Sequence, residues 1–203
     1  MNLSFLNSIS SFLVTLLAIL FSLSIHEFGH AFVANLNGDP TAKNLGRMTI
    51  NPIKHIDAIG MLMMFIIRFG WAKPVPVNTY NFKNYKIGNI TVSLAGIFMN
   101  LLSAVIFANI LQHIDSQLAN DILMNLVIYN IAFASFNILP LPPLDGWNLI
   151  ATFLPARTID LLNQYSRYVF IVFVIMMFTN TFSLILNPIY FTFTRLVESL
   201  IIF

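Results

Sequence analysis

The sequence contains no cysteine among its 203 residues. This absence excludes a disulfide framework and a metal site built on thiolates. Any metal ion must therefore be held by histidine, aspartate or glutamate side chains.

Charged residues are also scarce, at 9% of the chain, whereas hydrophobic residues make up 58%. A water-soluble domain carries about 25% charged residues, so this chain lacks the polar surface that water requires. The formal net charge is only +2, and no basic tract alternates with aromatic residues, which argues against nucleic acid as a partner. The composition indicates an integral membrane protein that has the lipid bilayer as its solvent.

Long apolar stretches define the expected fold. A helical span needs about 20 apolar residues, and four stretches are close to that length: 8–34, 90–111, 121–139 and 168–187. The first stretch has no Lys or Arg before it, so we expect a retained span rather than a signal peptide. The tail 188–203 is either a final partial span or an interfacial helix.

The expected fold class is an all-α polytopic membrane protein with about 4–6 transmembrane helices. Residues 1–203 would form a single intramembrane domain, with a core at about 10–155 and C-terminal helices at 165–203. Between the first two spans, the apolar run 58–67 is too short to cross a bilayer. We expect a re-entrant segment there, with a short β segment favoured by Val75, Val77, Thr79 and Tyr80.

Positive charges predict the orientation of the spans. Seven of the ten Lys and Arg residues lie in 35–89 and two more in 140–167, whereas 112–120 has none. By the positive-inside rule, 35–89 and 140–167 are cytoplasmic and 112–120 is external. The first and third spans then run in the same direction and end at the cytoplasmic face. This holds only if 58–77 does not cross the membrane.

The run His26-Glu27-Phe28-Gly29-His30 lies at the end of the first apolar stretch. Residues i and i+4 share one face of a helix, so the two imidazoles can bind one zinc ion. Glu27 would lie near the metal but be angled away from it, where it can take a proton from water. Ionisable groups at membrane depth are costly and usually functional. We therefore interpret the run as a metal site rather than a chance match.

A catalytic zinc site usually has three protein ligands, so one ligand must come from another segment. Three candidates are excluded because they lie on the external side: His113, Asp115 and Asp121. Asp145 is a good candidate because it ends the proline-interrupted segment 137–146 at the membrane edge. Its other interpretation is an N-cap for a helix that starts at Trp147. If Asp145 is not a ligand, Asp57 or His55 takes its place.

Together these motifs resemble the site-2 protease family of intramembrane zinc metalloproteases, peptidase family M50. The resemblance rests on four blocks in chain order: 26–30, 69–78, 93–100 and 137–146. The chain departs from the common pattern at Ile97, where many members have proline, and at Trp147, where many have a second glycine. Neither change removes a catalytic group. The resemblance implies a compact bacterial-type member without a PDZ domain.

The resemblance also implies roles for individual residues. The resemblance implies that each chain binds one Zn²⁺ and that Glu27 is the catalytic base. The zinc ligands would be His26, His30 and Asp145. Contacts to substrate or to the oxyanion would come from Asn100 and Asn137, although both asparagines also fit interhelical hydrogen bonding.

The expected function is intramembrane proteolysis of transmembrane protein substrates in a bacterial cell (inner) membrane. The active site would lie near the cytoplasmic face. A non-catalytic zinc-containing membrane scaffold that binds transmembrane helices is the alternative, but such a site has no need of Glu27. A metal or proton transporter would carry ionisable residues in several spans, and 90–111 and 168–187 have none.

Overall fold

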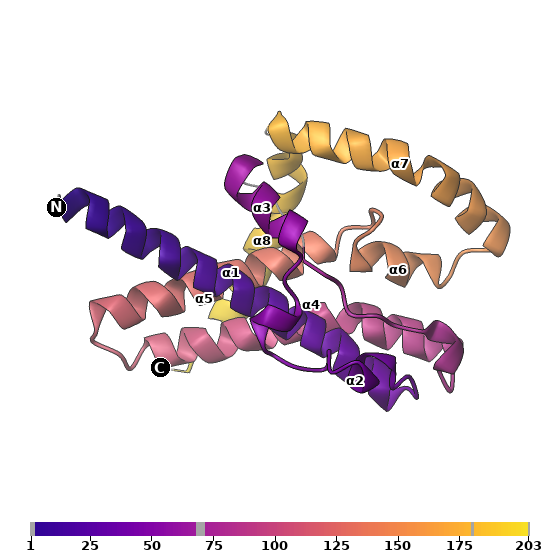
Figure 1. The fold of residues 1–203 in the computed structure, drawn as a ribbon, viewed down its shortest axis with the longest axis horizontal. Coiled ribbons are helices and arrows are strands. Elements are labelled where there is room, and N and C mark those ends of the chain that lie inside the picture. The colour runs from indigo at the N-terminus through magenta and orange to yellow at the C-terminus, as the bar shows by residue number, and fades with distance from the viewer. Residues whose placement is uncertain (1–2, 68–71, 180, 203) are drawn as a thin grey trace.

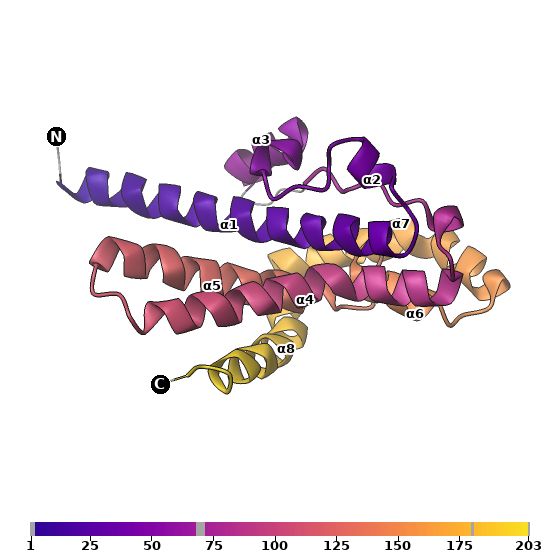
Figure 2. The ribbon, with the colours of Figure 1, turned by 90° about the horizontal axis from the view of Figure 1, so that it is seen from below.

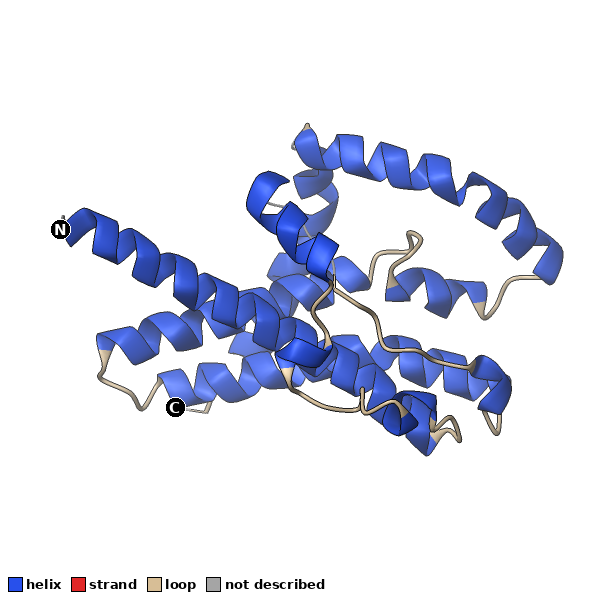
Figure 3. Ribbon diagram, in the orientation of Figure 1, coloured by secondary structure: helices blue, strands red, loops and turns tan. Residues whose placement is uncertain are grey.

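The computed structural model describes residues 3–67, 72–179 and 181–202 of the chain. Its α-helices and 3₁₀ helices follow one another as α1 (Leu3–Leu36), α2 (Thr41–Asn44), η1 (Pro52–Lys54), α3 (Ala58–Ile67), η2 (Thr79–Asn81), α4 (Tyr85–Leu111), α5 (Gln117–Asn137), α6 (Asp145–Ala151), α7 (Ala156–Phe178) and α8 (Thr181–Glu198). Four of them are long and apolar enough to cross a membrane, namely α1, α4, α5 and α7. The expected all-α polytopic class is confirmed (Figure 3).

The three helices α1, α4 and α5 lie side by side, with α1 and α5 running in one direction and α4 in the other (Figures 1 and 2). A stripe on α4 explains the close approach, because its buried face repeats every four residues with mostly small side chains: Gly88, Val92, Gly96, Asn100, Ala104 and Ala108. Small residues let transmembrane helices approach closely. The resulting van der Waals contacts hold the helices together, because in lipid the hydrophobic effect does not drive their association. This three-helix unit positions the candidate site.

The segment between α1 and α4 lies along the outside of α1 and contains α2, η1 and α3 (Figure 2). Helix α3 has 10 residues and is not among the four candidate spans, whereas residues 68–71 of the expected re-entrant segment lie outside the described residues. The expected short β segment differs in the structure. Among the described residues, only an isolated antiparallel bridge joins Ile56 to Ala72. Pro74 and Pro76 follow this bridge and lack the N–H groups that would extend it into a ladder.

The last apolar span has different bounds from those expected. The expected span 168–187 is wrong, because the helix that can cross starts at Ala156 and α7 ends at Phe178. Thr179 follows that end, and its Oγ1 donates to the carbonyls of Ile175 and Met176. A hydroxyl that bonds the preceding turn offers the backbone an alternative to continuing the helix.

Helices α7 and α8 form a hairpin that is attached to the three-helix unit through aromatic residues. The rings of Phe173 and Phe182 lie 5.2 Å apart, centroid to centroid, and both contact Phe136 of α5. Further along α8, Val197 packs into a cluster with Ala104 and Ile131. The first part of the tail 188–203, expected to be a final partial span or an interfacial helix, belongs to α8, which continues to Glu198.

Candidate metal centre

His26 and His30 lie one turn apart on α1 and face α4, and both are buried. Gly96 of α4 makes room for them. A Cβ atom at Gly96 would lie 2.5 Å from His26 Cε1 and 2.7 Å from His30 Nε2. Real Cβ atoms do not come this close to their neighbours, so glycine at this position is what allows the two imidazoles to fit against α4.

Asp145 reaches the two histidines from the start of α6. Its Oδ2 atom lies 3.1 Å from His26 Nε2 and 3.2 Å from His30 Nε2. Gly146 holds this helix against the end of α5, because a Cβ atom there would collide with the carbonyl of Ile138. Leu144 occupies the N-cap position and Asp145 is already helical. The carboxylate is therefore directed at the histidines and does not cap α6.

Each imidazole has a hydrogen-bond acceptor behind it. His30 Nδ1 lies 2.8 Å from the carbonyl oxygen of Val92, which can only accept, so Nδ1 carries the proton. His26 Nδ1 lies 2.8 Å from Oδ1 of Asn100, an equivalent contact. In the neutral form, both Nε2 atoms then present lone pairs toward the cavity. Groups that hydrogen-bond to a metal ligand without binding the metal, here called outer partners, generally orient the ligating histidines.

The three atoms at the centre cannot satisfy one another without a cation. The two Nε2 atoms, each with a lone pair, lie 3.0 Å apart, and Asp145 Oδ2 is buried without a hydrogen-bond partner among the described residues. A proton or a metal ion between them would remove the repulsion. Ligands about 2.0–2.1 Å from a tetrahedral zinc ion lie roughly 3.3 Å from one another, close to the separations found here. Two imidazoles and one carboxylate therefore fit zinc.

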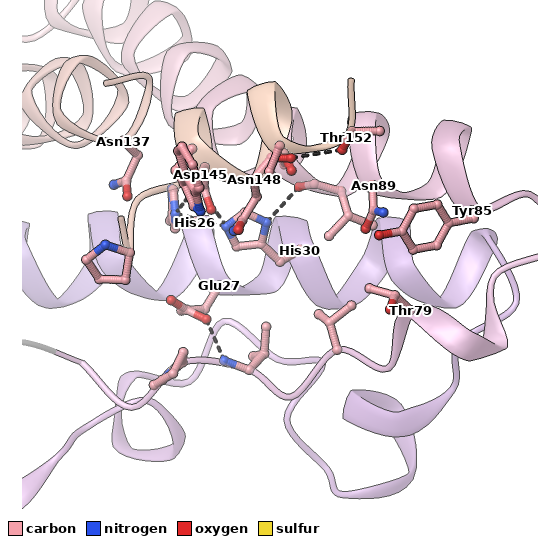
Figure 4. A pocket seen from close by; sticks show the side chains of 18 of the residues that line it. His26, Glu27, His30, Thr79, Tyr85, Asn89, Asn137, Asp145, Asn148 and Thr152 are labelled. Carbon is pink, nitrogen blue, oxygen red and sulfur yellow. Dashed lines mark hydrogen bonds and ion pairs between the residues drawn. The ribbon is translucent and has the colours of Figure 1, made fainter. Parts of the chain in front are cut away.

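Glu27 lies beside this trio but is not part of it. The ligand atoms that converge within 4.8 Å belong to His26, His30 and Asp145. The Glu27 side chain projects from α1 toward the segment after α3, and its Oε2 accepts a hydrogen bond of 2.7 Å from the backbone N–H of Val75 (Figure 4). This is the position expected of a carboxylate that contacts the cavity without ligating.

A cavity of about 640 Å³ opens in front of these residues. Its wall continues beyond His30 with side chains that are polar and uncharged: Thr79, Tyr85, Asn89, Asn148 and Thr152 (Figure 4). Such groups can hydrogen-bond a peptide backbone and do not select for either sign of charge.

The two asparagines singled out in the sequence lie in different places. Asn137 lines the cavity, and its Nδ2 donates to the carbonyl of Phe133 at 3.0 Å. Asn100 is fully buried behind His26 and is not part of the cavity wall. Its oxygen faces His26 and its Nδ2 faces two acceptors, Asn130 Oδ1 and the Ser22 carbonyl. The amide of Asn100 therefore orients an imidazole instead of facing a substrate.

His55 and Asp57, the alternative third ligands, have structural contacts. His55 is fully buried, with Nε2 2.7 Å from the carbonyl of Thr49. Asp57 Oδ1 accepts from the backbone N–H of Gly60 in the first turn of α3. The cluster of ligand atoms found among the described residues includes neither side chain.

Asp39 and Arg47 anchor the segment that contacts Glu27. Asp39 is fully buried and accepts hydrogen bonds from Thr41, from Asn81 and from the backbone N–H of Asn78. Burial alone would raise the pKa of Asp39, but these hydrogen bonds lower it below its usual value. Arg47 donates to the carbonyl of Lys73 at 2.8 Å. The turn sequence Gly38-Asp39-Pro40 is the one local signal that points to such an anchor.

Several named proteins are similar to this chain over most of its length. The chain is 38% identical over 187 residues to "Putative zinc metalloprotease YwhC" of Bacillus subtilis, a match that covers 85% of this chain and 83% of the relative. Two proteins named Rip2 carry the same description: that of Mycolicibacterium smegmatis is 29% identical over 86% of this chain and 70% of its own length, and that of Mycobacterium tuberculosis is 30% identical over 72% and 60%. No family model and no solved structure matches the chain.

Proposed function

Because the chain belongs to the zinc metalloprotease family that includes YwhC, we propose that it is an intramembrane protease of the site-2 type. Its substrates would be membrane proteins that are cut within or next to a transmembrane segment. One observation carries the proposal: two imidazoles and a carboxylate converge beside Glu27 in a cavity formed by apolar helices.

His26, His30 and Asp145 would hold one zinc ion per chain. Zinc held there supplies a Lewis acid that activates water and polarises a peptide carbonyl. The chain's own contribution is the orientation of its donors. Val92 and Asn100 hold the two imidazoles from behind, and Gly146 fixes the start of α6.

Glu27 is the proposed general base and acid. Its carboxylate takes a proton from the attacking water and later returns that proton to the amine that leaves. The Val75 N–H bond keeps the carboxylate directed away from the histidines, so that it moves protons and does not become a ligand. Asn137 lines the same cavity, and its amide is the proposed donor to the oxyanion.

The substrate must be locally unwound, because the backbone groups of a transmembrane helix are already paired with one another. The uncharged polar wall beyond His30 can receive the hydrogen-bonding groups that unwinding frees. The extended residues around Val75 lie next to it and are the proposed support for an extended substrate. The distribution of Lys and Arg supports a site near the cytoplasmic face of the cell membrane.

Glu27→Gln tests the proposal with purified protein and a single-span membrane substrate. We expect zinc content to stay at one ion per chain and cleavage to fall by about 10²–10⁴-fold, the usual contribution of a positioned base. Glu198→Gln, at the end of α8, is the matched control and should cleave as wild type does. Cleavage by Glu27→Gln at the wild-type rate would refute the proposed mechanism. Zinc and helix binding without any cleavage by the wild type would instead indicate the scaffold function.

A further inference from the structure

A second asparagine lies behind the metal centre, in the middle of α5. Asn130 is fully buried, and it is not part of the cavity wall. Its Oδ1 lies 2.8 Å from Nδ2 of Asn100, whose Oδ1 in turn lies 2.8 Å from Nδ1 of His26. A continuous chain of hydrogen bonds therefore joins α5 to α4 and α4 to α1.

Backbone carbonyls fix the direction of every hydrogen bond in this chain. Asn130 Nδ2 donates to the carbonyl of Leu126, and Asn100 Nδ2 donates to the carbonyl of Ser22, both at 2.8 Å. A carbonyl oxygen can only accept, so neither amide can be flipped without placing two oxygens face to face. The oxygen of Asn100 must then face His26, and His26 Nδ1 must carry the proton.

We propose that Asn130 is a positioning residue for the metal ligand His26, acting through Asn100 from two helices away. It keeps the Asn100 amide in one orientation and so keeps the lone pair of His26 on Nε2, where Asp145 and His30 converge. This inference rests on the metal centre of the proposed function, but it does not depend on which substrate is cut.

Loss of Asn130 changes the relative stability of the two orientations of the Asn100 side-chain amide. In Asn130→Leu, one N–H of the Asn100 Nδ2 group is left without an acceptor in a region that excludes water, which is costly. Only the Ser22 carbonyl then still opposes rotation of the amide, so the rotated orientation becomes more populated than in the wild type. The rotated amide presents a donor to His26 Nδ1 and moves the imidazole proton to Nε2, the atom needed for zinc.

Zinc affinity, measured by competition with a chelator, tests this relay without a protease assay. Outer partners of metal ligands typically contribute about 10–100-fold in metal affinity. We expect a loss near 100-fold for Asn100→Leu and near 10-fold for Asn130→Leu, because the second change acts through the first residue. The Co²⁺ spectrum of Asn130→Leu should also change, since it reports the ligand geometry.

Asn125 provides a matched control on the same helix. Its Nδ2 donates to the carbonyl of Asp121 at 2.8 Å, and Thr15 of α1 donates to its Oδ1 at 3.4 Å. Asn125 therefore also links α5 to α1, but it has no contact with Asn100. Asn125→Leu should bind zinc as the wild type does, which separates the relay from a general loss of helix packing.

Asn130→Asp keeps the experiment decisive if the leucine variant does not fold. A protonated aspartate has an acceptor oxygen and a donor hydroxyl in the places of Oδ1 and Nδ2, so we expect near-wild-type affinity. Wild-type zinc affinity in a folded Asn130→Leu protein would overturn the relay. A tenfold loss of zinc affinity in Asn130→Asp, with Asn125→Leu unaffected, would overturn it as well. Neither result would contradict the proposed protease function. A wild-type protein that binds no zinc would overturn both.

Discussion

The inner helices α1, α4 and α5 bury a different kind of surface from the outer hairpin α7–α8. In the inner unit, the buried side chains include many polar ones: Ser22, Ser24, His26, His30, Ser93, Asn100, Ser103, Asn130 and Ser135. In the described part of the outer hairpin, the buried residues are Phe173, Phe182 and Val197, all apolar. Buried residues make up 44% of the apolar stretch of α4 but only 6% of that of α7.

The difference indicates that the two regions have different roles. Hydrogen bonds are directional, so the inner unit can hold imidazoles and amides in fixed orientations. Aromatic packing holds the outer hairpin in place but imposes much weaker directional constraints. We therefore expect substitutions of the buried polar residues around the metal centre to affect zinc binding, and substitutions in the outer hairpin away from the cavity to affect stability or nothing.

Removal of a proposed ligand should give the largest effect. In His30→Ala, zinc affinity should fall by more than about 100-fold, because the loss of an outer partner alone costs about 10–100-fold. Metal content measured after dialysis checks this. His113→Ala, in the connection between α4 and α5, removes a histidine outside the site and should retain one zinc ion. Full zinc content in His30→Ala would show that the convergence on α1 is not a metal centre.

Gly96→Ala should rank next, although it adds only one methyl group. The new Cβ atom would lie 2.5 Å from His26 Cε1, so an imidazole or α4 must move. A misplacement of about 1 Å can cost about 100-fold in kcat/KM, and we expect a loss of that order in the cleavage rate. Phe98→Leu is the control, because Phe98 lies on the same helix and is 62% exposed. Similar losses in both variants would mean that α4 tolerates no change anywhere.

Much of this inner site could be predicted from the sequence. The pairing of His26 with His30 follows from helical spacing, which is a local property. The assignment of Asp145 depended on two further observations. It lies in a proline-interrupted segment, and the first and third spans were expected to run in the same direction. The structure brings all three together. The expectation that 58–77 does not cross stays a prediction.

The remaining features depend on contacts between distant segments. The side of α4 that faces α1 places Asn100 behind His26, and no local pattern reveals which side that is. Asn130 was missed, although a lone amide in the middle of an apolar span is itself a signal of interhelical hydrogen bonding. The bounds of the last span were wrong because its hydropathy was given more weight than the break at Thr179.

A moderate effect, confined to stability, is expected at the junction between the two regions. Phe182→Ala removes a ring that packs on Phe173 and Phe136. In water-soluble cores this change costs about 3–5 kcal/mol, and we expect about 1–3 kcal/mol here because lipid also solvates the exposed surface. The melting temperature should fall by about 2–12 °C while zinc affinity stays constant. Phe191→Ala, on an exposed part of α8, is the control, and a loss of zinc in Phe182→Ala would show that the two regions are coupled.

The smallest effect is expected on the outer surface of α7, and it tests whether this surface has a function. Ile175 is 56% exposed, and lipid tails are as apolar as its side chain, so Ile175→Ala exchanges one apolar contact for another. Zinc affinity and cleavage rate should remain within about twofold of wild type and the melting temperature within about 2 °C, since surface substitutions away from special features change stability by about 0.5 kcal/mol or less. A tenfold loss of cleavage with unchanged zinc affinity would contradict this. It would mean that α7 contacts the substrate on its way to the cavity, and that the outer hairpin shares in function although it takes no part in building the metal centre.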